Sequence, residues 1–339
     1  MLMDCLHLYI ICISLLLLIW YESANFLMTI TEELEYENIV NSLRGKLPSL
    51  PLILDELMTI ISDPNAALFA IKDVIQTDPS TYVQILKIAN TVEYRGGQEK
   101  RIINLDEAMH KLGLEKVKQI SQNISILKLF KEIEFTGYFS PESLWAHSVG
   151  VAVTSLNLAR FLSLSSTDKA YTCGLIHDIG KLAKLKYDQK MFCRELKQAK
   201  IGGTDNYQTE ISQSGIRHDK LGGLIANVWG ISSTVEAVCK WHHEEDRSKR
   251  TDVINPDDNK VIDIIQISNN LVNSMGFGNS GHNLKIPLSK KIMKRLRLSE
   301  SDLEEFKDKL LPELEREKQS LNALSENITF KPFQEETHS

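Results

Sequence analysis

The chain has 339 residues, a formal net charge of −6 and five scattered cysteines without a C-x-x-C pair. This length is ample for a buried core without disulfides, and the cysteine pattern argues against both a disulfide framework and a thiolate zinc site. The negative charge disfavours general nucleic-acid binding, because neutralisation of phosphates supplies most of that affinity. Because scattered cysteines fit a reducing compartment, we expect a cytoplasmic protein.

The first 28 residues are set apart by an almost wholly apolar stretch at residues 6–20. At about 15 residues it is short for a membrane span of roughly 20. It also lacks the basic region and the cleavage motif of a signal peptide. Two interpretations stay open for residues 1–28. They are a mis-assigned start, which we rank first, or a weak anchor that would give membrane association.

From Leu34 onward the apolar residues recur at helical spacing and no run of strands is evident, which predicts an all-α helical bundle. Residues 40–135 read as an N-terminal helical subdomain. Asp63-Pro64-Asn65 ends its first helix, Asp78-Pro79-Ser80 opens a later one, and Arg95-Gly96-Gly97 forms a loop. The expected helices cover residues 54–61, 69–75, 79–89, 104–112 and 114–130.

A second section, residues 140–245, begins where Ser140 and Pro141 provide a capping serine and a first-turn proline for a helix through Leu156. Trp229-Gly230 is typical of a helix stop, and residues 233–236 predict a capping box that opens the next helix. The polar residues 244–258 predict a surface loop. Together the two sections, residues 40–245, form one expected domain.

Residues 246–325 form an expected C-terminal helical extension, followed by a polar tail at residues 326–339. Residues 261–272 return to helix, and the basic residues 290–297 predict a solvated helix face. The last expected helix, residues 299–324, is amphipathic, and we expect Pro312 to kink it. Its apolar stripe either packs onto its own bundle or mediates a homodimer; the stripe consists of Leu303, Phe306, Leu310 and Leu314.

The central third holds a group of histidines at expected helix positions, with one aspartate beside them. Imidazole and carboxylate bind zinc, manganese or iron, and adjacent residues on a helix can both reach one ion. A single histidine on an apolar face is more often a hydrogen-bonded core residue, and for His147 alone we would accept that interpretation. The combined pattern favours a site. Its members are His147, His177, Asp178, His218, His242 and His243.

The spacing of these residues resembles that of the HD superfamily. Residues 174–181, Gly-Leu-Ile-His-Asp-Ile-Gly-Lys, look like the signature of HD phosphohydrolases, and residues 145–148 resemble the family's first histidine helix. His218, followed by Gly222 and residues 229–231, resembles the segment ahead of the paired His242-His243. The earlier pattern is similar to the helical subdomain of the HD-related output domain (HDOD) of bacterial signalling proteins; it comprises Asp78-Pro79, Leu86, Ala89-Asn90, Ala108 and Leu112-Gly113. The resemblance covers roughly residues 47–244.

Two departures bear on activity. HD hydrolases usually close the metal site with an aspartate on a late helix, and the matching position here is Asn269, whose neutral amide is a weaker ligand. The Gly-Tyr-Pro motif of HD-GYP phosphodiesterases is also absent, since Glu-Glu-Asp-Arg follows His243. Asn269 argues against an active phosphohydrolase, and the missing motif argues against hydrolysis of cyclic dinucleotides.

The resemblance implies a regulatory, non-catalytic signal-transduction module that binds a signalling protein or a small ligand. The alternative is a metal-dependent phosphohydrolase acting on a nucleotide or cyclic nucleotide with zinc, manganese or iron. In that case His147, His177 and Asp178 would hold one ion, Lys181 would supply positive charge toward a phosphate, and Asn269 would stand at a degenerate ligand position. A second ion would be held by His218, His242 and His243. In a third interpretation the histidines are internal hydrogen-bonding groups without metal or ligand.

Overall fold

The computed structural model describes residues 31–43, 68–96, 101–131, 139–164, 167–282 and 284–325. Within these ranges the chain is helical and contains no strand, which confirms the predicted all-α class. The chain divides into two compact units, Met1–Arg44 and Gly45–Ser339, and residues 31–43 of the first unit form a helix. The leader at residues 1–28 and the helix expected at residues 54–61 lie outside the described ranges. None of the helices that are described is long and apolar enough to cross a membrane.

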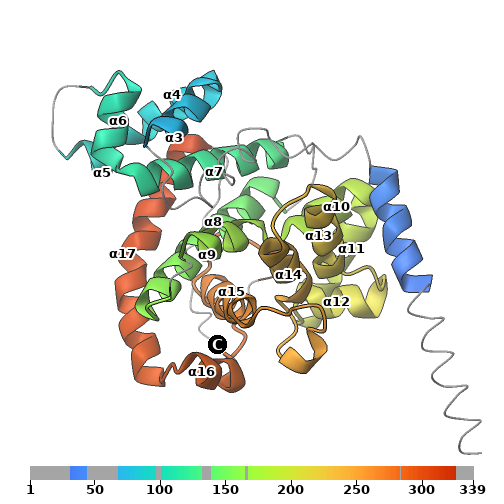
Figure 1. Ribbon diagram of the computed structural model, residues 1–339. Coiled ribbons are helices and arrows are strands. Elements are labelled where there is room, and N and C mark those ends of the chain that lie inside the picture. The colour runs from blue at the N-terminus through green and yellow to red at the C-terminus, as the bar shows by residue number, and fades with distance from the viewer. Residues whose placement is uncertain are drawn as a thin grey trace, which may run out of the picture. The chain divides into compact units, whose positions relative to one another are not determined.

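The N-terminal helices of the second unit pack around α4 and the long α7 (Figure 1). The side chain of Asp78 caps α4 through the backbone N–H of Ser80, and Asn104 caps α6 through that of Glu107. The helices expected at residues 69–75, 79–89, 104–112 and 114–130 are therefore present. Their bounds are α3 Leu68–Gln76, α4 Pro79–Ala89, α5 Val92–Arg95, α6 Leu105–Leu112 and α7 Leu114–Lys131.

Seven helices follow, and α8 is the central one. Ser140 caps α8 through the N–H of Ser143, with Pro141 in its first turn, as predicted. Along the bundle α8 packs on α9, while α13 packs on both α10 and α14. The bounds are α8 Pro141–Phe161, α9 Thr167–Ile176, α10 Ile179–Tyr187, α11 Gln189–Gly202, α12 Asn206–Gln213, α13 His218–Val228 and α14 Ser233–Trp241.

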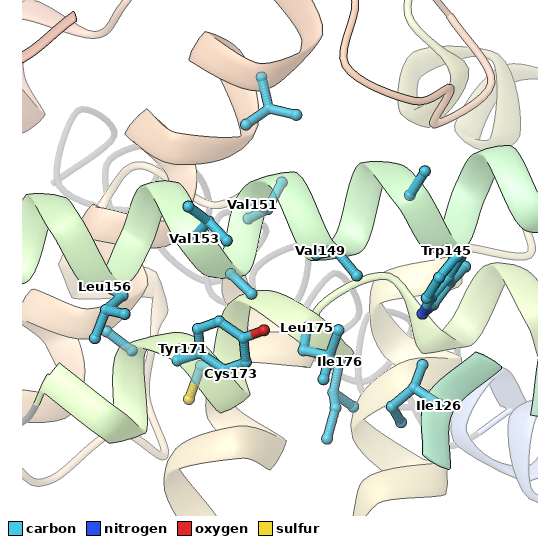
Figure 2. Close-up of a cluster of buried hydrophobic side chains, with 14 of the residues drawn as sticks. Ile126, Trp145, Val149, Val151, Val153, Leu156, Tyr171, Cys173, Leu175 and Ile176 are labelled. Atoms are coloured by element: carbon cyan, nitrogen blue, oxygen red, sulfur yellow. The ribbon is translucent and has the colours of Figure 1, made fainter. Parts of the chain in front are cut away.

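The core between α8 and α9 explains why α8 carries apolar or small residues on almost every face. Figure 2 shows Val149 of α8 beside Leu175 and Ile176 of α9, and Leu156 of α8 beside Tyr171 of α9, all of them buried. A helix that is buried on most of its surface loses the one-sided pattern of a surface helix. The indole N–H of Trp145, which is fully buried, donates to the carbonyl of Asn123 on α7 over 3.1 Å. The core thus fixes the helix that carries His147.

Three C-terminal helices follow within the described residues: α15 Pro256–Ser274, α16 Lys290–Leu296 and α17 Glu300–Leu324. Helix α15 packs on α8, α9 and α14, and α17 lies along α8 and reaches α4 (Figure 1). The leucine and phenylalanine stripe of α17 is buried, so it packs onto its own bundle. The kink expected at Pro312 and the homodimer stay predictions.

The predicted capping box of α14 was wrong. The N-cap is Ser232, whose side chain forms no cap, so the helix begins one residue earlier than predicted and its N3 position is Val235 rather than Glu236. The surface loop expected at residues 244–258 is present as far as Asn255 and contains a short 3-10 turn, Arg247–Lys249, before α15 begins at Pro256. Arg250 is its one buried side chain, which pairs with Asp263 and donates to the carbonyl of Glu244.

Candidate metal centre

The histidines and the aspartate lie mostly at helix ends. His147 is inside α8, but His177 and Asp178 form the two-residue turn between α9 and α10. His218 is the first residue of α13, while His242 and His243 follow the end of α14. The expectation that all five histidines lie within helices is therefore wrong. Around His177 and Asp178 the residues on both sides of the break are buried, so the apolar pattern runs across this helix end without marking it.

A close approach of two helices brings His218 beside Asp178. A Cβ atom added at Gly180, in the first turn of α10, would lie 1.8 Å from the carbonyl oxygen of His218 and 2.7 Å from the nitrogen of Gly222. Only glycine leaves room for this contact. The glycine of the His-Asp-Ile-Gly-Lys motif thus has a packing role, which joins the turn of Asp178 to the start of α13.

Four donors, here called the four-donor group, face one point: Asp178, His218, His242 and His243. The Nε2 atom of His218 lies 3.2 Å from Oδ1 of Asp178, 3.3 Å from Nε2 of His242 and 3.1 Å from Nε2 of His243. The Nε2 atom of His242 lies 3.5 Å from Oδ1 of Asp178. A tetrahedron with metal bonds of about 2.0 to 2.1 Å has edges of about 3.3 to 3.4 Å. The spacing of the donors therefore fits a tetrahedral ion.

A second set, here called the three-donor group, shares Asp178 and adds His147 and His177. It is looser, since Oδ2 of Asp178 lies 3.4 Å from Nε2 of His177 and 3.9 Å from Nε2 of His147. Among the residues that the structure describes, neither ring nitrogen of His147 has a hydrogen-bond partner, although the side chain is fully buried. A buried polar group in that state destabilises a fold by about 1 to 3 kcal/mol.

Hydrogen bonds on the far side of three rings point their Nε2 atoms at the centre. The Nδ1 atom of His177 lies 2.7 Å from the carbonyl oxygen of Gly174, and that of His242 lies 2.9 Å from the carbonyl of Cys239. Nδ1 of His218 lies 2.7 Å from Oε2 of Glu210. Since carbonyls and carboxylates only accept, each Nδ1 donates, and a neutral ring then carries its lone pair on Nε2. This is the tautomer that binds a metal through Nε2.

Glu210 belongs to a buried charged network that sequence reasoning missed. The ammonium of Lys184 lies 2.7 Å from Glu195 and 3.1 Å from Glu210, and all three side chains are buried. Burial raises the pKa of Glu210, but His218 and Lys184 outweigh it and hold the pKa at about 2. Lysine and glutamate in a polar helix pattern usually indicate a solvated face. Only the tertiary contacts between α10, α11 and α12 show that these are internal.

The electrostatics favour a charged aspartate among mostly neutral imidazoles. Burial raises the pKa of Asp178, but the Lys181 ammonium and His177 hold it well below its ordinary value. Burial lowers the pKa of His147 and of His243 well below the ordinary histidine value. For His218 burial lowers the pKa, but Glu210 outweighs it and raises the pKa. An ionised carboxylate and unprotonated imidazoles are the forms that coordinate a metal.

Lys181 and Asn269 are both buried, and a chain of hydrogen bonds connects them. The ammonium of Lys181 lies 2.7 Å from Oδ2 of Asp178 and donates to the carbonyl of Ser280 over 2.9 Å. The hydroxyl of Ser280 donates to Asn273, whose amide donates to Oδ1 of Asn269 over 3.1 Å. The chain of hydrogen bonds links the degenerate position on α15 to Asp178. A ligand role for Asn269 stays a prediction.

Tyr207, at the start of α12, covers the outer face of the centre and was also missed. Its ring stacks on that of His243 with centroids 4.0 Å apart and planes at 10°. His243 is the one partly exposed member of the four-donor group. Stacking holds its ring in place, so Tyr207 orients the donor that lies nearest the surface.

Comparison with known proteins finds HDOD domain proteins and related helical structures. The HDOD domain family model matches residues 47–245. An HDOD domain protein of unknown function from Geobacter sulfurreducens superposes with a TM-score of 0.69 at 20% identity, covering 86% of this chain and 99% of that one. A proposed phosphohydrolase from Shewanella amazonensis SB2B gives 0.62 at 18% identity, covering 85% and 98%. A proposed signal transduction protein from Marinobacter aquaeolei VT8 gives 0.64 at 20%, covering 82% and 59%. None of the curated proteins matches. At these identities the solved structures show a shared fold.

Proposed function

Because the chain belongs to the HDOD domain family, we propose that it is a regulatory signal-transduction module that binds a signalling protein or a small ligand and has no catalytic activity of its own. The HDOD family supports the proposal, and so does a structural neighbour described as a proposed signal transduction protein. The family supports the function class, and the geometry of the site supports the absence of catalysis.

The carrying observation is that the four-donor group supplies every ligand of a tetrahedral ion from the protein itself. Structural zinc sites are closed in this way, whereas catalytic zinc sites keep a position open for water or substrate. An ion held by three imidazoles and one carboxylate would be zinc or a similar divalent transition metal. It would tie together the α9–α10 turn, the start of α13 and the end of α14. Its contribution would be to stability.

Asn269 supports the same proposal, because an amide stands where HD hydrolases carry a carboxylate. Lys181 supports it too, since its ammonium is already bonded to Asp178 and Ser280 instead of being directed to an open site. A residue engaged in this way is poorly placed to bind an incoming phosphate.

A metal-dependent phosphohydrolase acting on a nucleotide or cyclic nucleotide is the second candidate. The observation in its favour is His147, a fully buried histidine beside Asp178 whose ring nitrogens have no partner within the described residues. Such a group could take up a substrate or its attacking water. Two similar structures are also described as proposed phosphohydrolases.

The test combines metal content with hydrolysis of bis(p-nitrophenyl) phosphate and p-nitrophenyl phosphate by the zinc- or manganese-loaded full chain. The control is the His218→Ala, His242→Ala double variant. We expect bound metal that the variant loses, and no hydrolysis above the variant. Hydrolysis that disappears in the variant would establish the phosphohydrolase instead. Absence of metal from both proteins would favour histidines that serve only as internal hydrogen-bonding groups.

A further inference from the structure

We infer that the ammonium of Lys181 takes the place of a second metal ion, so that the chain binds one divalent ion at the four-donor group and none at the three-donor group. The inference depends on the metal centre argued under the proposed function. It goes further by fixing the number of ions and the residue that sets it.

The two oxygens of Asp178 serve different sides of the centre. Oδ1 faces the Nε2 atoms of His218 and His242 at 3.2 and 3.5 Å and, although buried, has no hydrogen-bond partner within the described part of the chain. Oδ2 faces the three-donor group, and its nearest partner there is the Lys181 ammonium at 2.7 Å, closer than either imidazole. One oxygen is therefore free to bind an ion, while the other already carries a cation.

The backbone around Ser280 holds Lys181 in this position. Its ammonium donates to the carbonyl of Ser280, and its side chain is 3% exposed. The preceding residue, Asn279, donates its N–H to the carbonyl of Ser143 on α8 over 2.9 Å. Gly278 has φ +72°, and a Cβ atom there would lie 2.2 Å from the nitrogen of His147. The segment that fixes the ammonium is thus packed directly against α8.

Charge and geometry then disfavour a second ion. An ion that bound Oδ2 at about 2 Å in the three-donor group would lie within about 5 Å of the ammonium nitrogen, because that nitrogen is 2.7 Å from the same oxygen. Two cations at that separation repel strongly in a buried site, where water screens them poorly. The donors of this group are also fewer and farther apart than those of the four-donor group. The ammonium neutralises the carboxylate there without a metal.

The experiment counts zinc ions per chain by equilibrium dialysis and elemental analysis, without reference to activity. The proteins are the full chain, Lys181→Met and the control Lys190→Met, which removes an exposed lysine of α11. We expect one ion in the full chain and in the control, and two ions in Lys181→Met, because methionine keeps the side-chain volume but removes the charge.

Two ions in the unmodified chain would overturn the inference while leaving the proposed metal centre standing. One ion in Lys181→Met would show that another feature excludes the second ion, and no ion in the unmodified chain would remove the centre itself. If Lys181→Met does not fold, two other variants decide the matter. His243→Ala should weaken zinc affinity about tenfold or more, and His147→Ala should change it little; the reverse order would overturn the inference.

Discussion

Oε2 of Glu210 accepts two hydrogen bonds from His218, one from the backbone N–H over 2.9 Å and one at 2.7 Å from the ring Nδ1. A single buried carboxylate therefore fixes both the start of α13 and the orientation of the imidazole. Because the ring donates through Nδ1, its Nε2 lone pair points toward the other three members of the four-donor group.

We predict that Glu210→Gln weakens zinc binding by roughly 10- to 100-fold, because a neutral amide holds the ring less firmly and makes Nε2 a weaker donor. A competition titration against a chelator of known affinity measures the change. The matched control is Glu304→Gln on the surface of α17, which should bind zinc as the unmodified chain does. Equal affinities for the two variants would show that Glu210 does not orient the ligand.

The same carboxylate predicts a pH dependence of the metal-free protein. The pKa of Glu210 is about 2 in the folded state, against 4.5 ordinarily. Because the pKa is lowered in the folded state, the ionised carboxylate stabilises the fold fully at pH values above the ordinary pKa of 4.5. This stabilisation is lost as the pH falls toward 2. The full effect is about 3 kcal/mol, of which about 2 kcal/mol disappears between about pH 5.5 and about pH 3. Urea unfolding at these two pH values should show that loss in the unmodified chain and a smaller one in Glu210→Gln. Parallel losses would contradict it.

The helices could be predicted where the chain carries local signals. Asp78 and Ser140 cap α4 and α8 as their sequence positions indicate, because a capping side chain bonds only to its own neighbours. The six metal-ligand candidates were found for a related reason. Histidines and an aspartate at a distinctive spacing are recognisable in the sequence, and the structure brings their side chains together.

The rest depends on contacts between distant residues. Lys184 and Glu210 look like solvated residues until α10, α11 and α12 pack, and Arg250 looks like part of an exposed loop until Asp263 is placed beside it. The helix end at Asp178 was missed because burial continues across it, whereas the end of α14 at Trp241 lies close to the loop predicted from residue 244. Periodicity reports which residues are inside; it does not report where a buried helix stops.

Asp263 on α15 is the buried partner of three arginines, Arg247, Arg250 and Arg295. We predict that Asp263→Asn lowers the free energy of unfolding by about 3 to 5 kcal/mol, because it leaves the buried guanidinium of Arg250 without a counter-charge. Chemical denaturation measures this. Asp257→Asn, which removes an exposed carboxylate of the same helix, is the control and should change little. A small effect of Asp263→Asn would mean that the arginines turn to water.

A substitution at Gly180 can distinguish the packing role of the motif from its role in metal binding. Gly180→Ala would place a Cβ atom 1.8 Å from the carbonyl oxygen of His218, so α10 and α13 must move apart. We predict a loss of about 3 kcal/mol in the free energy of unfolding. We also predict weaker zinc binding, since the same displacement carries His218 away from Asp178. Gly202→Ala is the matched control, because it lies in helix α11 with its nearest contact at 3.6 Å. It should leave stability unchanged or raise it by less than about 1 kcal/mol through helix propensity. If Gly180→Ala destabilised the fold while zinc affinity stayed the same, the approach of α10 to α13 would serve packing alone, and the four-donor group would have to be held by Glu210 and Tyr207 without it.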